Sequence, residues 1–146
     1  TGPTYERFDH GIHVDVPHQP GTYLYALTKS LGQEICAVMA PEQDAYVMDL
    51  LFYMFVDVEV DKAESGSPIA NLGHDLVPYT VSWRDAADAF RLAMEVGLEN
   101  LASRSEVFFV FPDLPHQKFS NDKVKRVLGW EARDTLEQFW RKKATT

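Results

Sequence analysis

The residues best suited to chemistry in this sequence are Tyr25 and Lys29, in the stretch Tyr25-Ala26-Leu27-Thr28-Lys29. Two side chains four positions apart lie on one face of a helix, about 6 Å apart at their Cβ atoms. An ammonium group close to a phenol favours the phenolate, so the pair could move a proton to or from an alcohol oxygen. The same spacing also arises when a surface lysine follows a half-buried tyrosine, and spacing alone leaves both interpretations open.

A second group of potentially reactive side chains precedes this pair: Asp9, His10, His13, Asp15 and His18. Imidazole and carboxylate groups close in sequence can bind zinc or another divalent cation. The spacing matches no established metal motif, and prolines and glycines interrupt the segment. We therefore predict a polar surface loop here and no metal site.

The composition excludes several classes of partner. Fourteen lysine and arginine residues against 22 acidic ones give the 146-residue chain a net charge of −8 and a pI near 5.0. Nucleic-acid binding needs a basic face, and a bilayer span needs about 20 apolar residues, whereas the longest nearly apolar run covers 45–56. We expect neither a nucleic-acid nor a membrane partner. The single cysteine, Cys36, cannot form an internal disulfide, which favours a cytoplasmic protein.

Hydrophobic patterning predicts alternating helices and strands. A helix is expected from about Thr22 to Pro41, with one apolar stripe. Residues 45–56 predict a strand buried on both faces, and 107–111 predict a second strand. Ser82 predicts the N-cap of a helix that ends near Val96, and two further helices follow, one ended by Gly129 and one starting near Asp134. This order predicts an α/β fold. The apolar stripe consists of Leu24, Leu27, Leu31, Ile35 and Val38; the inward residues of the Ser82 helix are Ala86, Phe90, Ala93 and Met94.

Three stretches, in order, resemble the extended short-chain dehydrogenase/reductase family, the NAD(P)-dependent epimerases, dehydratases and uronate-type dehydrogenases of sugars and sugar nucleotides. Residues 20–34 look like the active-site helix, with a proline, a short gap and Tyr-x-x-x-Lys. Residues 81–90 are similar to the strand-to-helix segment with its Asp-x-Ala pattern, and 116–130 to the C-terminal segment ending in Leu-Gly-Trp. The resemblance implies a partial Rossmann-like fold with few parallel strands and flanking helices.

The resemblance also implies roles for individual residues. Tyr25 would be the general acid/base, and Lys29 would favour its phenolate and hold the nicotinamide ribose of NAD or NADP. Thr1 falls at the family's catalytic Ser/Thr, where it would hydrogen-bond the substrate; it could equally be a terminal residue without a role. Arg84 is the nearest candidate for substrate binding, although a surface position in a first helical turn explains it as well.

The whole chain, 1–146, corresponds in this alignment to one domain, the second half of the family fold. Its eight glycines form no G-x-G-x-x-G or G-x-x-G-x-x-G motif, so the dinucleotide-binding half is not among these residues and tight cofactor binding by this chain alone is not expected. The family's usual Arg and Asn are missing from the corresponding stretch 49–55, and its phosphate-binding Arg is missing from 77–80, which favours a small sugar or uronic acid as substrate. The alternative is a non-catalytic relative acting as an oligomeric interaction module, and apolar strands that need cover predict a homo-oligomer.

Overall fold

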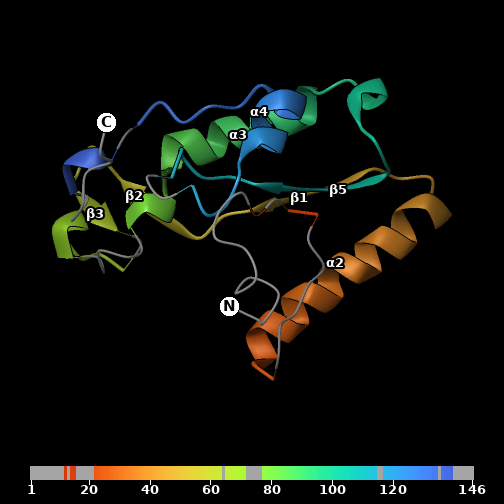
Figure 1. Cartoon of the computed structure of the whole chain (residues 1–146), viewed down its shortest axis with the longest axis horizontal. Coiled ribbons are helices and arrows are strands. Elements are labelled where there is room, and N and C mark those ends of the chain that lie inside the picture. Colours follow the sequence, from red (N-terminus) through yellow and green to blue (C-terminus); the bar gives the residue numbers. More distant parts are fainter. Residues whose placement is uncertain are drawn as a thin grey trace.

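The computed structural model describes residues 12, 14–15, 22–63, 65–71, 77–114, 117–134 and 136–139. Helices and strands alternate, as Figure 1 shows. The helices are α2 (Leu24–Glu42), α3 (Trp83–Glu95) and α4 (Asp122–Leu128), and the strands are β1 (Val47–Leu51), β2 (Met54–Asp57), β3 (Lys62–Ala63), β4 (Thr80–Ser82) and β5 (Ser105–Phe109). Short 3-10 turns cover Ile69–Asn71, Val77–Tyr79, Leu98–Asn100 and Glu137–Phe139.

The described strands form two small sheets. β1 and β5 are parallel, in a register that pairs Val47 with Ser105 and Leu51 with Phe109. β2 lies between β4, which is parallel to it, and β3, which is antiparallel. Figure 1 shows α3 and α4 on one side of the β1–β5 sheet and α2 on the other. The chain is thus a mixed α/β structure with few parallel strands and flanking helices, as the sequence predicted.

The predicted strand over 45–56 is wrong as a single element. The chain leaves the first sheet after Leu51 and enters the second at Met54. At the break, the ring of Phe52 packs against Phe55 of β2 and Phe90 of α3, with centroids 5.1 and 5.6 Å away. Apolar residues continue through the break because both sheets need them, so composition alone could not reveal the change of sheet.

The main core lies between the β1–β5 sheet and the helices α3 and α4. Phe108 of β5 is fully buried there with Val124 and Leu128 of α4. α3 contributes small residues, since Ala86, Ala89 and Ala93 are buried. Phe90 and Met94, which were predicted to face inward, are 54% and 80% exposed. The alanines let α3 approach the sheet closely, so Phe90 and Met94 lie at the margin of the contact and stay largely exposed.

The ends of α3 and α4 follow local signals. The side chain of Ser82 accepts a hydrogen bond of 3.0 Å from the backbone N–H of Asp85, which confirms the predicted N-cap. Gly129 ends α4 in the left-handed conformation, with φ of 67°, which confirms the predicted stop. The helix predicted from Asp134 is wrong over the described residues, where only the 3-10 turn Glu137–Phe139 forms.

Helix α2 presents two different apolar faces. The face toward the sheet carries Ala26, Cys36 and Ala40, and of these only Ala40 is fully buried. The predicted apolar stripe lies on the opposite face and is exposed along its length. Its exposed fractions run from 36% at Leu27 to 70% at Leu24. Pro41 sits one residue before the end of α2, where its missing N–H removes only one helical hydrogen bond.

Candidate functional site

Tyr25 and Lys29 lie together in the first turns of α2. The ammonium nitrogen of Lys29 is 5.4 Å from the centroid of the Tyr25 ring, within range of a cation–π interaction. The ring of Tyr23 is 6.1 Å from that of Tyr25, and the hydroxyl of Thr28 donates to the Tyr25 carbonyl at 2.8 Å. Tyr25 is 62% exposed, so its phenol is accessible to a ligand. The proton-transfer role assigned to the pair stays a prediction.

The position of this pair follows from the direction of α2. The helix ends at Glu42 and the chain enters β1 at Val47, so α2 and β1 run in opposite directions. The first turns of α2 therefore lie on the side of the carboxyl ends of β1 and β5, where open α/β sheets bind ligands. Figure 1 shows that α2 diverges from the sheet toward this end.

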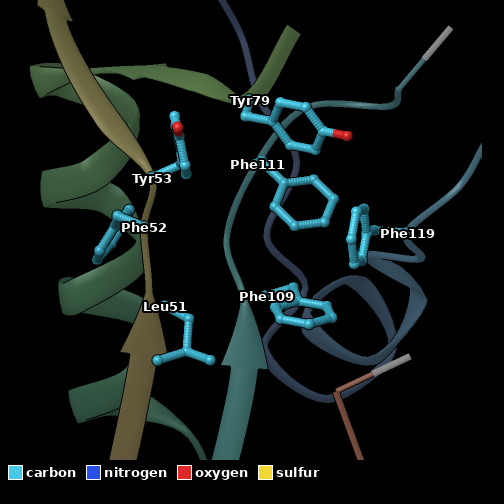
Figure 2. Close-up of a pocket in the computed structure, with 7 residues that line it drawn as sticks. All are labelled: Leu51, Phe52, Tyr53, Tyr79, Phe109, Phe111 and Phe119. Carbon is cyan, nitrogen blue, oxygen red and sulfur yellow. The ribbon is translucent and has the colours of Figure 1, made fainter. Parts of the chain in front are cut away.

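A cavity of about 340 Å³ opens at the carboxyl ends of β1 and β5. Leu51 and Phe109, the last residues of the two strands and register partners, both line it. Figure 2 shows the residues from the end of β1 on one side and the phenylalanine rings on the other. The described lining residues are Leu51, Phe52, Tyr53, Tyr79, Phe109, Phe111 and Phe119.

The rings around this cavity contact one another. Tyr79 lies edge-on to Phe111 and Phe119, with centroids 6.0 Å away in each case, and Phe109 contacts both phenylalanines at 5.5 and 5.9 Å. The pKa of the Tyr79 phenol is raised by burial and by the nearby Tyr53. The phenol therefore stays neutral through physiological pH.

The sequence analysis did not predict this cavity, because aromatic residues on strands are most simply assigned to the core. That assignment holds for Phe108, which is fully buried. It also holds for Phe111, which is 5% exposed, and Phe52 and Phe109 pack against the same core. These three rings and Tyr53 line the cavity as well. Phe52, Tyr53 and Phe111 follow the last residues of the observed strands β1 and β5, where ligand sites form. The predicted strands extended over these residues, so the sequence held no separate signal for the cavity.

One carboxylate lies on the same face of β1 as the cavity. Asp49 precedes Leu51 by two residues, and alternate residues of a strand share a face. Its Oδ2 atom is buried and has no hydrogen-bond partner, and burial raises the pKa of this carboxyl group. Asp49 is thus an acidic group on a partly covered surface.

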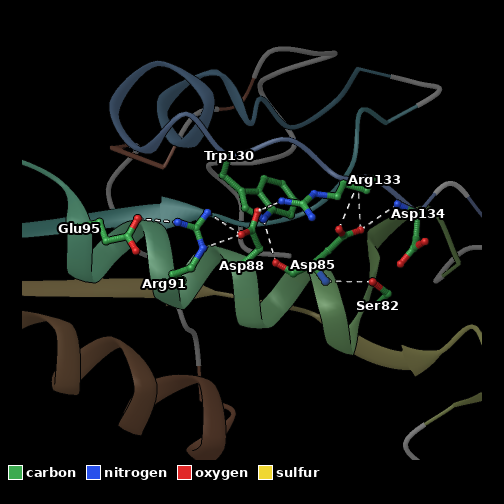
Figure 3. A network of polar contacts seen from close by, with 8 residues as sticks. All are labelled: Ser82, Asp85, Asp88, Arg91, Glu95, Trp130, Arg133 and Asp134. Atoms are coloured by element: carbon green, nitrogen blue, oxygen red, sulfur yellow. Dashed lines mark hydrogen bonds and ion pairs between the residues drawn. The ribbon is translucent and has the colours of Figure 1, made fainter.

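A network of polar contacts fixes the start of α3 (Figure 3). Asp85 is only 1% exposed, and its carboxylate accepts hydrogen bonds from the backbone N–H groups of Arg133 and Asp134 at 3.0–3.1 Å. The indole N–H of Trp130 donates to the Asp85 carbonyl at 2.9 Å. Arg84, the predicted substrate-binding residue, forms an ion pair with Asp134. These contacts join α3 to residues 130–134, and the substrate role of Arg84 stays a prediction.

Other predicted site residues fall outside the described part of the chain. These are Thr1 and the histidines and aspartate of the early segment, Asp9, His10, His13 and His18. Asp15 is described and forms an ion pair of 3.0 Å with Lys123. Among the residues that the structure describes, no three or more His, Cys, Asp or Glu side chains gather in a way that could hold a metal ion. Within the same residues, no helix has the length and apolar character to cross a membrane.

Two solved structures are similar to this chain. Glucuronic acid dehydrogenase from Chromohalobacter salexigens superposes with a TM-score of 0.65 and 18% identity, over 89% of this chain and 42% of that one. A mutated uronate dehydrogenase superposes with a TM-score of 0.60 and 18% identity, over 89% of this chain and 41% of that one. No family model and no curated protein matches the sequence.

The likeness to these dehydrogenases shows the fold. The chain has a partial Rossmann-like fold, and it spans less than half the length of the structures that it resembles. That partial coverage agrees with the sequence resemblance, which placed the chain in one half of a dehydrogenase fold.

Proposed function

We propose that this chain is the substrate-side part of an NAD(P)-dependent oxidoreductase acting on a sugar-type alcohol. The observation that carries the proposal is the adjacency of Tyr25 and Lys29 in a helix whose first turns point to the ligand-binding side of a Rossmann-like fold. The names of the two similar structures support a sugar acid or related alcohol as the substrate class.

The chain's own residues would move the proton. As a phenolate, Tyr25 would take the hydroxyl proton of the substrate, and Lys29 would stabilise that negative charge. Thr1 would hydrogen-bond the same substrate oxygen. A bound nicotinamide would accept the hydride that leaves the alcohol carbon. Tyr25 and Lys29 would hold the nicotinamide ribose of the dinucleotide. The sequence carries no Gly-rich turn for the pyrophosphate, so these residues would supply the chain's contacts to the cofactor.

Titration of the chain with NADH, followed by fluorescence, tests this proposal. Saturable binding with Kd of about 1 mM or below is expected, and the absence of such binding would contradict cofactor use by this chain. Where turnover of glucuronate is seen, Tyr25→Phe should reduce kcat about 10²- to 10⁴-fold and leave NADH binding nearly unchanged. Lys29→Ala should weaken both, and Lys62→Ala, at another exposed lysine, should affect neither.

A second candidate function, an oligomeric interaction module, rests on the exposed stripe of α2. The stripe is symmetric about Leu31, because Leu27 and Ile35 lie four residues to either side and Leu24 and Val38 seven residues to either side. Two antiparallel copies of α2 related by a two-fold axis at Leu31 would therefore match apolar residues along the whole stripe. Self-complementarity of this kind is what a two-fold dimer requires.

Sedimentation at micromolar concentrations tests the second candidate. We expect a dimer for the wild-type chain and a monomer for Leu31→Glu, which would place two carboxylates at the centre of the contact. Leu98→Glu, at a leucine of similar exposure outside α2, should leave the dimer intact. A wild-type monomer of 16.6 kDa would contradict self-association and leave the oxidoreductase proposal unaffected.

A further inference from the structure

The aromatic cavity at the carboxyl ends of β1 and β5 has the properties of a ligand site of its own. Its volume of about 340 Å³ lies at the small end of the range of about 300–1,000 Å³ that ligand pockets occupy. Ligands of open α/β sheets bind at this end of the strands. Both size and position therefore suit a small molecule.

The described lining of this cavity carries no formal charge. Its polar side-chain groups are the phenols of Tyr53 and Tyr79, and the remaining lining side chains are hydrocarbon. In β1 the charged residue on this face is Asp49, and its carboxylate would repel an anion. The chain as a whole carries a net charge of −8, which also disfavours anions.

Among the described lining residues an anionic ligand would meet no cation to replace the water it leaves, and such desolvation is strongly unfavourable. A neutral ring faces no such penalty and would contact Phe109, Phe111 and Phe119 through stacked or edge-to-face arrangements. Tyr53, which is 58% exposed at the rim, could exchange a hydrogen bond with one hydroxyl or carbonyl group of the ligand.

We propose that this cavity binds a small, neutral, largely apolar ring compound bearing one or two hydroxyl or carbonyl groups. The site needs no dinucleotide, so the proposal stands apart from the oxidoreductase function.

A matched pair of fluorescent probes tests the preference for a neutral ring. N-phenyl-1-naphthylamine is neutral, and 8-anilino-1-naphthalenesulfonate has the same rings with one negative charge. The neutral probe should bind with a stoichiometry of one per chain and at least about tenfold more tightly than the sulfonate. Equal affinity, tighter sulfonate binding or no saturable binding would overturn the proposal.

Variants locate the bound probe. Tyr53→Ala should weaken the neutral probe about fivefold, whereas Tyr46→Ala, at an exposed tyrosine outside the cavity lining, should not. Tyr53→Lys places a cation at the rim and should shift the preference toward the sulfonate. Leu31→Glu should leave neutral-probe binding unchanged; loss of binding there would show that the probe occupies the stripe of α2 and would overturn the proposal. Urea unfolding curves verify that each variant is folded.

Discussion

The two faces of the β1–β5 sheet are covered in different ways. On one face, α3 and α4 bury Phe108, and Glu106 meets the ammonium group of Lys123 at 2.9 Å. On the other face, α2 buries one alanine, the Oδ2 atom of Asp49 has no partner, and a cavity lies at the strand ends. On the first face, the described residues cover the sheet and pair the charge of Glu106. The second carries the candidate chemistry and is the face that the described residues cover least.

This difference teaches how stability and function are divided in the molecule. Most contacts of the main core lie beside α3 and α4, away from Tyr25, and the cavity rings pack against the edge of that core. A ligand or a second polypeptide at the α2 face could therefore bind without displacing those contacts. The following predictions test the division, in order of decreasing effect.

The largest effect is expected at Asp85. Asp85→Ala would leave the partly buried N–H groups of Arg133 and Asp134 without an acceptor and should lower the free energy of unfolding by about 3 kcal/mol. Asp88→Asn, on the same helix, loses ion pairs to exposed parts of Arg91 and Arg133 and should cost less than about 1 kcal/mol. Urea unfolding of both variants makes the comparison, and equal losses would contradict it.

The next effect concerns the ion pair on the covered face. Burial opposes ionisation of Glu106, but Lys123 and the Ser103 amide outweigh it and lower the pKa of Glu106 below its usual value. A lowered folded-state pKa stabilises the fold above the unfolded-state value, and that stabilisation is lost as the pH falls through the folded-state pKa. Lys123→Met should cost about 3 kcal/mol at about pH 7 and much less in acid, where Glu106 is protonated. A loss independent of pH would refute this assignment.

A smaller contrast is expected between the two helices. Ala89→Leu adds volume at a fully buried position of α3 and should cost about 2 kcal/mol. Leu31→Ala removes an exposed side chain of α2 and should change the unfolding free energy of the monomer by less than about 0.5 kcal/mol. Thermal or urea unfolding at a concentration where the chain is monomeric provides the measurement. A larger loss for Leu31→Ala would mean that the stripe packs within the chain.

The smallest effect has the opposite sign. Burial raises the pKa of Asp49, so its ionised form destabilises the fold and stability falls as the pH rises through the folded-state value. Asp49→Asn should therefore stabilise the chain by about 1 kcal/mol at about pH 7 and lose this advantage in acid. A destabilised variant at neutral pH would show that the carboxylate has a partner in solution.

The sequence predicted the features that depend on local chemistry. Ser82 and Gly129 mark helix ends through their own backbone and side-chain properties, and the apolar runs located the strands β1 and β5. Hydrophobic spacing found the stripe of α2 but could not say which face of the helix meets the sheet, since small residues on the opposite face make that contact. It likewise could not separate core rings from cavity rings, because burial depends on neighbours far away in sequence.

Of the candidate site, the adjacency of Tyr25 and Lys29 followed from the helical period alone. The cavity did not, because Phe119 reaches it from a segment far along the chain from β1. The position of Phe119 depends on a bridge to Ile12, in which the Ile12 N–H donates to the Lys118 carbonyl and the Ser120 N–H donates to the Ile12 carbonyl, each at 2.7 Å. No sequence period connects residues that far apart.

The uncharged stripe of α2 also determines how association would respond to ionic strength. Two copies with a net charge of −8 each repel one another at long range, while the stripe that would join them carries no charge. Added salt shortens the range of that repulsion, from a Debye length of about 30 Å at 0.01 M to about 10 Å at 0.1 M, and leaves the apolar contact intact. Association through α2 should therefore strengthen as salt is added, the reverse of a contact held by ion pairs.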